Sequence, residues 1–373
     1  MPKKSVLMVK KKILIAAGGT GGHLFPAQAL ARELLEKGDY EVKFCASGLA
    51  SNRCFSKEMF SYFEITSATP FKKKIASCFL ALFSLIKGGF ESVRILTRYK
   101  PDLIVGFGSF HTAPVLFGAV LTRVPFILYE SNSFPGKVNR LFSKWAKVSS
   151  ISFKSAEKHL LGKIEITEMP LWKRQMHKKL SKEEAREYFG LKPDVMTLLV
   201  FGGSQGAFSI NSQFSKAAEL LKKTCTYQVI HLIGKKENLE NMKQHYASIS
   251  INACVKEFEE MMSIAWQAAD LAICRSGAAT IFEQVLFEIP AIFIPYPFAS
   301  EKHQQENARF IVEDVKGGKM LLEEDLTVQK LSSLISACLD PEKQELKSMK
   351  NALLAFKEQT PKKTLFSLVE ENL

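Results

Sequence analysis

Short apolar runs alternate with amphipathic stretches in the first part of the chain. Residues 13–17 (ILIAA) lie between lysines and glycines, and residues 26–36 follow with apolar positions at helical spacing. Similar apolar runs at 42–46, 103–106 and 126–129 alternate with further helical patterns. Apolar strands separated by helices are typical of a parallel sheet that is covered on both faces.

The same order of elements starts again near residue 195. An apolar run over 195–201 ends in glycines, a helical pattern covers 209–222, and strand-like runs follow at 229–233, 271–274 and 291–294. The pattern therefore predicts an α/β protein with two doubly wound, Rossmann-like parallel-sheet domains that face each other across a cleft.

The length of 373 residues also favours two domains, because one hydrophobic core seldom organises so long a chain. We place the first domain at 1–168 and the second at 169–344. The basic stretch 172–187 is predicted to be a linker that runs into a helix. The helical tail 345–373 is expected to pack back on the first domain.

Charge is distributed unevenly along the chain. The formal net charge is +13, and residues 1–150 hold 22 Lys and Arg against 9 Asp and Glu, so 22 − 9 accounts for all of it. Such an asymmetry indicates that one half meets an anionic surface, either acidic lipid or nucleic acid. No RNP, KH or helix-turn-helix pattern supports the nucleic-acid alternative, and salt-dependent gel shifts would test it.

The seven cysteines form no CxxC pair and no ligand-like cluster, which indicates reduced thiols in a cytoplasmic protein without a bound metal. The lysines near the start resemble the basic region of a signal peptide, but the apolar run after them ends early at glycines. We expect neither a signal peptide nor a transmembrane span.

A glycine loop, Gly18 to His23 (GGTGGH), follows the first predicted strand and opens a helix. Glycines allow close backbone approach, and the amides of a helix start favour a phosphate or pyrophosphate. The alternative is a tight turn without a ligand. The glycine order differs from the dinucleotide fingerprint, and no acidic residue closes the second strand.

The second half carries two comparable junctions. Residues 202–206 (GGSQG) repeat the glycine loop, and residues 275–283 (RSGAATIFE) lead from a strand into a helix. A carboxylate at Glu283 suits the vicinal hydroxyls of a ribose, although alone it would be an ordinary surface residue. Residues 303–307 (HQQEN) present amides suited to sugar hydroxyls, or simply a polar helix start.

Together these motifs resemble the MurG family of GT-B glycosyltransferases over nearly the whole chain. The match runs from GGTGGH through PDLIVGFG and ESN to GGSQGA, CRSGAATIFE and HQQENA, in order and spacing. The resemblance implies an inverting transfer of N-acetylglucosamine from UDP-N-acetylglucosamine to a lipid-linked N-acetylmuramyl-pentapeptide in peptidoglycan synthesis. It implies no cofactor.

The resemblance also assigns residues to the donor site. Ser204 and Gln205 are expected to hold the diphosphate, Glu283 the ribose, and the backbone of Phe258 and Glu259 the uracil. Gln304, His303 and Asn307 are expected at the sugar. The strand-to-helix junction and the residues on the catalytic and acceptor side complete the donor-binding set: Arg275, Ser276, Gly277, Ala278, Ala279, Thr280, Thr20, Gly21, Gly22 and Asn132.

Three elements depart from the family pattern. The family's GGY element is Gly108, Ser109 and Phe110 here, and its HEQN is residues 129–132 (YESN). Its NPVR is residues 169–172 (MPLW), which puts Trp172 where an arginine is expected, with Lys173 or Arg174 as candidate substitutes. The first two departures lie on the acceptor side, so the donor is better defined than the acceptor.

Transfer at an anomeric carbon needs a group that deprotonates the attacking hydroxyl and groups that neutralise the departing diphosphate. His23 ends the first glycine loop, and imidazole titrates near neutrality, so it is the first candidate base. Glu130 is the second. With no metal-ligand cluster in the sequence, backbone dipoles are expected to stabilise the leaving group.

A membrane-docking segment is predicted in the first domain. Apolar residues at helical spacing follow three lysines and precede Lys87, in a run too short to span a bilayer. The predicted anchor residues are Lys72, Lys73, Lys74, Ile75, Phe79, Leu82, Phe83 and Ile86. The alternative is a core helix with a lysine cap. The expected location is the cytoplasmic face of the inner membrane, with cell-wall synthesis proteins as further partners and no nucleic acid.

Two other enzymes would share this architecture. A glycosyltransferase acting on diacylglycerol would need the same fold and membrane charge. A UDP-N-acetylglucosamine epimerase would need no lipid acceptor. Product analysis with each acceptor separates the three.

Overall fold

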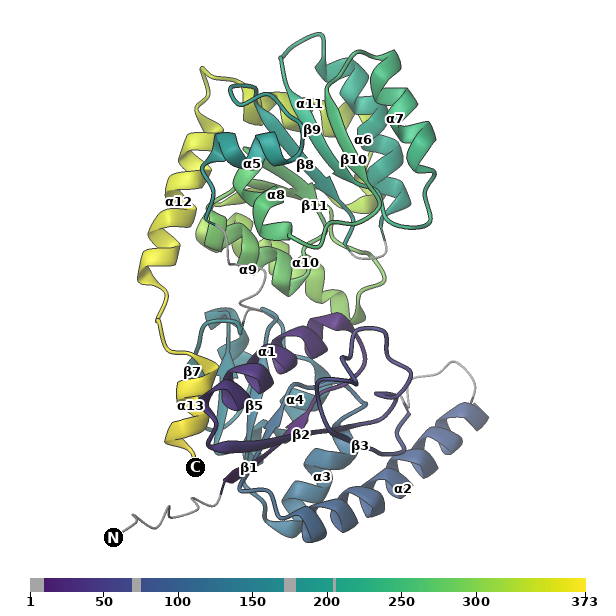
Figure 1. Ribbon diagram of the computed structural model, residues 1–373, viewed down its shortest axis with the longest axis vertical. Coiled ribbons are helices and arrows are strands. Elements are labelled where there is room, and N and C mark those ends of the chain that lie inside the picture. The colour runs from purple at the N-terminus through teal and green to yellow at the C-terminus, as the bar shows by residue number, and fades with distance from the viewer. Residues whose placement is uncertain (1–9, 69–74, 171–178, 204–205) are drawn as a thin grey trace, which may run out of the picture. The chain divides into compact units, whose positions relative to one another are not determined.

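The computed structural model describes residues 10–68, 75–170, 179–203 and 206–373, and for 75–79 and 300 the backbone alone. The chain folds into two units, Met1–Trp172 with Pro361–Leu373, and Lys173–Thr360 (Figure 1). Each unit is a parallel sheet between layers of helices, as the alternation of apolar runs and helical patterns predicts.

The first unit contains a seven-stranded, wholly parallel sheet in the order β3-β2-β1-β4-β5-β6-β7. Its strands are β1 (Lys11–Ala16), β2 (Tyr40–Ala46), β3 (Tyr62–Glu64), β4 (Leu103–Gly106), β5 (Phe126–Glu130), β6 (Val148–Ile151) and β7 (Ile164–Ile166). Its helices are α1 (Gly21–Lys37), α2 (Ile75–Tyr99), α3 (Ala113–Thr122), α4 (Lys137–Phe142), the 3-10 turns Ser143–Trp145 and Lys154–His159, and α13 (Leu365–Glu371).

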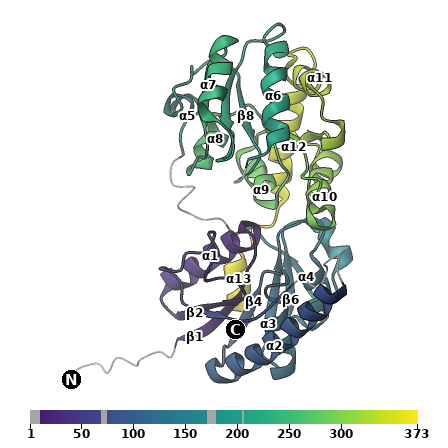
Figure 2. The same ribbon diagram turned by 90° about the vertical axis from the view of Figure 1, so that its right-hand side faces the viewer.

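One face of this sheet packs against α2, α3 and α4. Leu14, Ile104 and Leu128 from the strands meet Leu96 of α2 and Leu116 of α3 in one buried cluster. The pair α1 and α13 packs together elsewhere in the unit, and the ring of Tyr40 meets Phe366 of α13 edge-on (Figure 2).

The helix after the first glycine loop begins at Gly21, five residues before the predicted start at residue 26. Pro26 therefore lies in the second turn rather than the first. Because proline has no N–H, the carbonyl of Gly22 loses its usual partner there.

The second unit contains a six-stranded, wholly parallel sheet in the order β10-β9-β8-β11-β12-β13. Its strands are β8 (Thr197–Phe201), β9 (Gln228–Leu232), β10 (Ala253–Lys256), β11 (Leu271–Cys274), β12 (Ala291–Phe293) and β13 (Gly318–Met320). Its α-helices are α5 (Lys182–Tyr188), α6 (Phe208–Leu221), α7 (Leu239–Ser248), α8 (Met262–Ala268), α9 (Ala278–Phe287), α10 (His303–Arg309), α11 (Val328–Leu339) and α12 (Glu345–Gln359), with shorter turns at Ser300–Lys302, Phe310–Val315 and Glu323–Asp325.

The core of the second unit lies mainly between the sheet and α6 and α11. Val200 and Ile273 of the strands pack with Phe214 of α6 and Ile335 of α11. Trp266 of α8 is fully buried and meets the ring of Phe201 edge-on. The heavily apolar strands explain why the sequence pattern identified β8, β9, β11 and β12.

The tail differs from the expected single helix that returns to the first domain. It forms two helices: α12 belongs to the second unit, and α13 with residues 361–373 belongs to the first. The ring of Phe310 meets Phe356 of α12 edge-on, and Lys357 bonds to Glu288. These contacts keep 345–360 in the second unit, whereas Phe366 and Glu370 bind Tyr40 in the first.

Candidate active site

In the second unit, the predicted donor residues follow the strands at the carboxyl edge of the sheet. The chain order reverses between β8 and β11, which are neighbours although two strands, β9 and β10, separate them in sequence order. Ligands of open α/β sheets bind in the crevice at such a switch point. The glycine loop after β8 and the junction after β11 meet there.

The glycine loop after β8 is tightly turned. Gly203 and Gly206 have φ angles of 87° and 75°, in the region that favours glycine. A Cβ on Gly206 would clash with the carbonyl oxygen of Ile233. Ser204 and Gln205, expected at the diphosphate, lie outside the described residues.

The junction after β11 presents a helix start without a side-chain cap. Gly277 is the N-cap of α9, and the first turn holds no acidic residue, so the amides of Ala278, Ala279 and Thr280 are oriented for an anion. Two bonds fix the turn: Ser276 Oγ donates to the Gln304 carbonyl at 2.7 Å, and Asn307 Nδ2 donates to the Ser276 carbonyl at 3.1 Å. The fully buried Asn307 thus supports the turn.

Glu283 lies in the second turn of α9 with a partner that the sequence did not indicate. The indole Nε1 of Trp266 donates to Glu283 Oε2 at 2.8 Å. Burial raises the pKa of Glu283 to about 7, and the indole bond lowers it by a smaller amount. One carboxylate oxygen is thereby oriented, and Oε1 is left for a ligand.

The loop between β10 and α8 holds Phe258 and Glu259. Glu259 is buried, and its carboxylate accepts from Lys256 Nζ at 2.6 Å and from the Met261 amide at 2.8 Å. The Phe258 ring is 53% exposed. The Glu259 side chain therefore fixes the loop. The backbone N–H and C=O groups of this segment are what it can offer to a nucleobase such as uracil.

The Arg275 side chain bonds to other groups of the protein. Its guanidinium donates to the carbonyls of Ile294 and Pro295 at 2.9 and 3.0 Å and forms an ion pair with Glu323. It also lies 5.5 Å from the centroid of the Tyr296 ring. These contacts tie Arg275 to the loop after β12, and its direct contact with the donor stays a prediction.

The segment before α10 is strained. Glu301 and Lys302 have φ angles of 51° and 55°, which non-glycine residues rarely adopt. Gln304 Oε1 accepts from the Tyr296 amide at 3.0 Å, which leaves the Gln304 amide nitrogen to donate. His303 is half-buried in the first turn of the same helix.

In the first unit, the glycine loop after β1 leads into α1. Thr20 is the N-cap without a side-chain capping bond, and Gly21, Gly22 and His23 form the first turn. Gly22 is exposed and His23 is half-buried. The amides at this helix start suit an anion, and the imidazole lies on the same turn.

The second candidate base, Glu130, is buried and fully hydrogen bonded. Oε1 accepts from the backbone and side-chain nitrogens of Asn132, both at 3.0 Å. Oε2 accepts from the Gly136 amide at 2.9 Å and from Asn139 Nδ2 at 3.0 Å. These four bonds occupy both carboxylate oxygens, so the position of Glu130 suits support of the 131–136 loop.

The helices α2 and α3 expose large apolar side chains. Leu80, Phe83 and Phe90 are 70%, 68% and 75% exposed, and Leu82 and Ile86 are also exposed. Phe117 and Leu121 of α3, which packs on α2, extend this patch. The side chains of Ile75 and Phe79 and the whole of Lys72, Lys73 and Lys74 lie outside the described residues. Among the described residues, no helix is long and apolar enough to cross a membrane.

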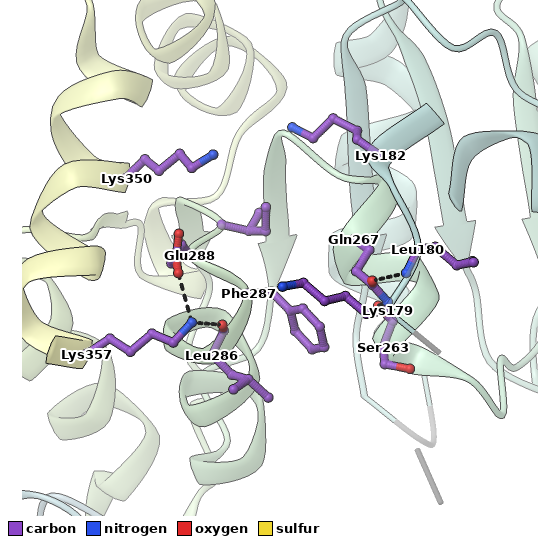
Figure 3. A pocket seen from close by; sticks show the side chains of 11 residues that line it. Lys179, Leu180, Lys182, Ser263, Gln267, Leu286, Phe287, Glu288, Lys350 and Lys357 are labelled. Atoms are coloured by element: carbon purple, nitrogen blue, oxygen red, sulfur yellow. Dashed lines mark hydrogen bonds and ion pairs between the residues drawn. The ribbon is translucent and has the colours of Figure 1, made fainter. Parts of the chain in front are cut away.

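A pocket of about 490 Å³ lies at the carboxyl end of α9 (Figure 3). Lys179, Lys182, Lys350 and Lys357 surround it, together with apolar side chains that include Phe287. Lys357 donates to the Leu286 carbonyl at 2.7 Å and to Glu288 at 2.8 Å, and Lys182 pairs with Asp270 at 2.6 Å. These bonds connect α12 and α5 to the unit.

The replacement for the family's arginine cannot be placed, because Trp172, Lys173 and Arg174 lie outside the described residues. Within the described part of the chain, no three His, Cys, Asp or Glu residues are grouped as metal ligands. The sequence analysis did not single out Trp266, which bonds to Glu283, or His111, which packs on the first glycine loop. Trp266 belongs to no motif, and His111 directly follows residues 108–110, the segment that departs from the GGY element.

Two family models match the chain. The glycosyltransferase family 28 N-terminal domain matches residues 13–150, and the glycosyltransferase family 28 C-terminal domain matches residues 197–365. Together they cover most of both units.

The curated relatives match over almost their full length. A Protochlamydia amoebophila protein is 40% identical over 97% of this chain and 96% of its own length. A Chlamydia trachomatis serovar L2 protein is 36% identical over 97% and 99%. Both bear the name UDP-N-acetylglucosamine--N-acetylmuramyl-(pentapeptide) pyrophosphoryl-undecaprenol N-acetylglucosamine transferase.

Solved structures share the architecture. The crystal structure of Acinetobacter baumannii MurG matches with a TM-score of 0.75 and 25% identity over 97% of this chain and 98% of that one. Rice Os79 with UDP matches with a TM-score of 0.70 at 9% identity, over 97% of this chain and 99% of that one, which is a likeness of fold alone. Both units therefore have the GT-B arrangement of strands and helices.

Proposed function

The chain belongs to glycosyltransferase family 28, and we propose that it transfers N-acetylglucosamine from UDP-N-acetylglucosamine to a lipid-linked N-acetylmuramyl-pentapeptide. The observation that carries this proposal is the 40% identity, over 97% of the chain, to a relative named for that reaction. The enzyme is a hexosyltransferase of peptidoglycan synthesis.

The second unit binds the donor in this proposal. The amides at the start of α9 and the glycine loop after β8 hold the diphosphate and neutralise its charge as it departs. Glu283 Oε1 accepts a hydrogen bond from the ribose, while Trp266 keeps the carboxylate oriented. Gln304 donates its amide to the sugar, and the backbone of Phe258 and Glu259 meets the uracil.

The first unit binds the acceptor and supplies the base. His23 removes the proton from the attacking hydroxyl, because Glu130 is occupied by four hydrogen bonds. One direct displacement then inverts the configuration at the anomeric carbon. Asn132, fixed by Glu130, lies on the acceptor side of the same sheet edge.

The exposed patch on α2 and α3 docks on the membrane that holds the acceptor lipid. Phe83, Ile86 and Phe90 share one stripe of α2 with Lys87 and Arg94, so apolar insertion and attraction to acidic headgroups act on the same face. The proposed location is the cytoplasmic face of the inner membrane.

A transfer assay with labelled UDP-N-acetylglucosamine tests the function. We expect label in the lipid fraction with the muramyl-peptide pyrophosphoryl lipid, and none with diacylglycerol. Labelled diacylglycerol would assign the chain to the other glycosyltransferase class. Release of UDP and an epimerised sugar without any acceptor would assign it to the epimerases.

A further inference from the structure

The first unit has a switch point of its own, between β1 and β4. The two strands are neighbours in the sheet, and the chain order reverses there. The glycine loop follows β1, and the turn 107–112 follows β4. The crevice expected for a ligand of this unit is therefore bordered by both segments.

His111, on the turn after β4, packs directly against the glycine loop. A Cβ added to Gly18 would lie 2.9 Å from His111 Cβ, and one added to Gly19 would lie 3.1 Å from His111 Cδ2. Only glycines at these two positions leave room for the imidazole. The ring thus borders the backbone that is expected to receive an anion.

The imidazole is held at one nitrogen by the end of β2. Nδ1 lies 2.8 Å from Ser47 Oγ and 3.1 Å from the Ser47 carbonyl oxygen. A carbonyl oxygen can only accept, so we assign the ring hydrogen of the neutral form to Nδ1. Nε2 then carries the lone pair, and among the described residues no hydrogen bond to Nε2 is present.

The turn that carries His111 is rigid and strained. Gly108 and Ser109 have φ angles of 78° and 76°, the second on a residue with a side chain. Thr112 Oγ1 donates to the carbonyls of Gly108 and Ser109, and the Ser47 amide donates to the His111 carbonyl at 3.2 Å. Strain of this kind persists where the surroundings impose it, and it is frequent at binding sites.

We propose that His111 is a ligand for the phosphate of the acceptor. When the acceptor's diphosphate enters the glycine loop, Nε2 takes up a proton from solvent, and the imidazolium donates Nε2–H to a phosphate oxygen. Nδ1 keeps its hydrogen and its bond to Ser47 throughout. This inference rests on the proposed function and adds a residue that binds the acceptor without touching the sugar under transfer.

The other titratable groups around the imidazole are accounted for on each neighbouring element. His23 lies on α1, and Glu64 at the end of β3 accepts from the amides of Gly48 and Ala50. Burial raises the pKa of the Cys45 thiol on β2 far above its ordinary value, so this thiol stays neutral. Glu91 of α2 accepts from Thr66. His23, in the first turn of α1, is therefore the other imidazole at this glycine loop whose role has to be separated from that of His111.

Two substitutions separate the roles of the two ring nitrogens. The amide of His111→Asn can replace Nδ1 at Ser47 but does not reach the position of Nε2. The amide of His111→Gln can reach the position of Nε2 as a donor that does not titrate. His245→Asn is the matched control, because that imidazole lies on α7 of the second unit and bonds to the Ser215 carbonyl.

We expect His111→Asn to raise the KM for the lipid acceptor and the Kd for inorganic pyrophosphate about tenfold, the size of one lost charge-assisted bond. The donor KM and kcat should stay within about twofold. In His111→Gln the acceptor KM and the pyrophosphate Kd should recover partly, because the amide donates from the position of Nε2.

Several results would overturn the proposal: an unchanged acceptor KM and pyrophosphate Kd in folded His111→Asn, a fall in kcat alone, or an equal loss in His245→Asn. Pyrophosphate titration needs no turnover. If the wild type transfers no sugar to the muramyl lipid, the proposed function fails, whereas the titration still decides the role of His111.

Discussion

Glu283 and Trp266 form a pair whose two members depend on each other. Trp266 is fully buried, so its indole N–H needs an acceptor, and Glu283 supplies it. Replacement of Glu283 by Ala would remove the ribose contact and also leave the indole unpaired. Glu283→Gln keeps an acceptor for the indole and removes only the charge, so it is the sharper variant.

The affinity for UDP should depend on the protonation of Glu283. The pKa of this carboxyl is raised to about 7, so it gains a proton as the pH falls through 7. Ribose hydroxyls donate to the ionised form, so UDP should bind about tenfold more weakly at pH 6 than at pH 8 through this group. Calorimetric titration across this range measures the effect.

The control for this prediction is Glu283→Gln, which cannot titrate at this position. The terminal phosphate of UDP also titrates in the range, so the ratio of wild-type to variant affinity isolates the carboxyl. A ratio that stays constant from pH 6 to pH 8 would show that Glu283 does not bind the ribose as an anion.

The raised pKa of Glu283 gives the stability of the folded protein a pH dependence opposite to that of UDP binding. A raised folded-state pKa means that the folded protein binds the proton more tightly than the unfolded chain does. This contribution to stability is complete below the unfolded value of 4.5 and is lost as the pH rises through about 7. Donor binding and the stability of the free protein therefore have opposite pH dependences at this residue.

His23 and Glu130 should behave differently when they are replaced. His23→Ala removes the proposed base and should lower kcat about a hundredfold to ten-thousandfold, with UDP affinity unchanged. Glu130→Gln keeps an acceptor for two of its donors but unsettles the loop, so it should lower the melting temperature as well as activity. Turnover and thermal unfolding of both variants check this, and a wild-type kcat in His23→Ala would make Glu130 the candidate base again.

At the scale of elements, the carboxyl end of α9 shows how α12 is tied to the second unit. The helix ends at Glu288, which has a φ of 58°, and Lys357 bonds both to its carboxylate and to the carbonyl of Leu286 (Figure 3). The last carbonyls of a helix lack partners within it, and a lysine there satisfies one of them. The tail therefore stabilises the helix whose other end is the proposed diphosphate site.

Lys357→Met should destabilise the second unit by about 1 kcal/mol, because it removes a half-exposed ion pair and one bond to a carbonyl. The expected fall in melting temperature is about 2–4 °C for a unit of this size. Lys350→Met is the matched control, since Lys350 lines the same pocket and has no ion pair among the described residues. Equal melting temperatures for the two variants would contradict the prediction.

At the scale of the molecule, all of the net positive charge lies in residues 1–150, in the unit that exposes the apolar patch. Loss of the basic charges and loss of the exposed apolar area should each weaken membrane binding. Each basic residue near an acidic surface contributes about 1 kcal/mol. Residues 151–373 carry no net charge.

Flotation with anionic liposomes tests this docking. The double variant Phe83→Ser and Phe90→Ser should lose most of its binding, because both rings are largely exposed on α2. The control is Leu161→Ser, which removes a side chain that is 59% exposed in another part of the unit. Equal flotation of the double variant and the wild type would place the anchor elsewhere, with Lys72 to Lys74 as the next residues to test.

The sequence alone determined the fold class and the principal strands. β4 and β11 have the predicted bounds, since their side chains are fully buried and the pattern is unambiguous. The short strands β3 and β7 had no such signal, because their residues are partly exposed and lie at sheet edges. The division of the tail was also mispredicted, because its composition is helical on both sides of residue 360.

The sequence could predict the glycine loops as phosphate sites because such a site needs a strand, glycines and a helix start in consecutive residues. The sequence could not indicate that Trp266 orients Glu283, that four donors occupy Glu130, or that His111 packs on Gly18. Each of these contacts joins residues far apart in the chain or depends on a local turn geometry. The parallel pairing of β1 and β4 brings the carboxyl ends of the two strands together. This pairing, which only the tertiary structure shows, decides which side chains meet at that edge of the sheet.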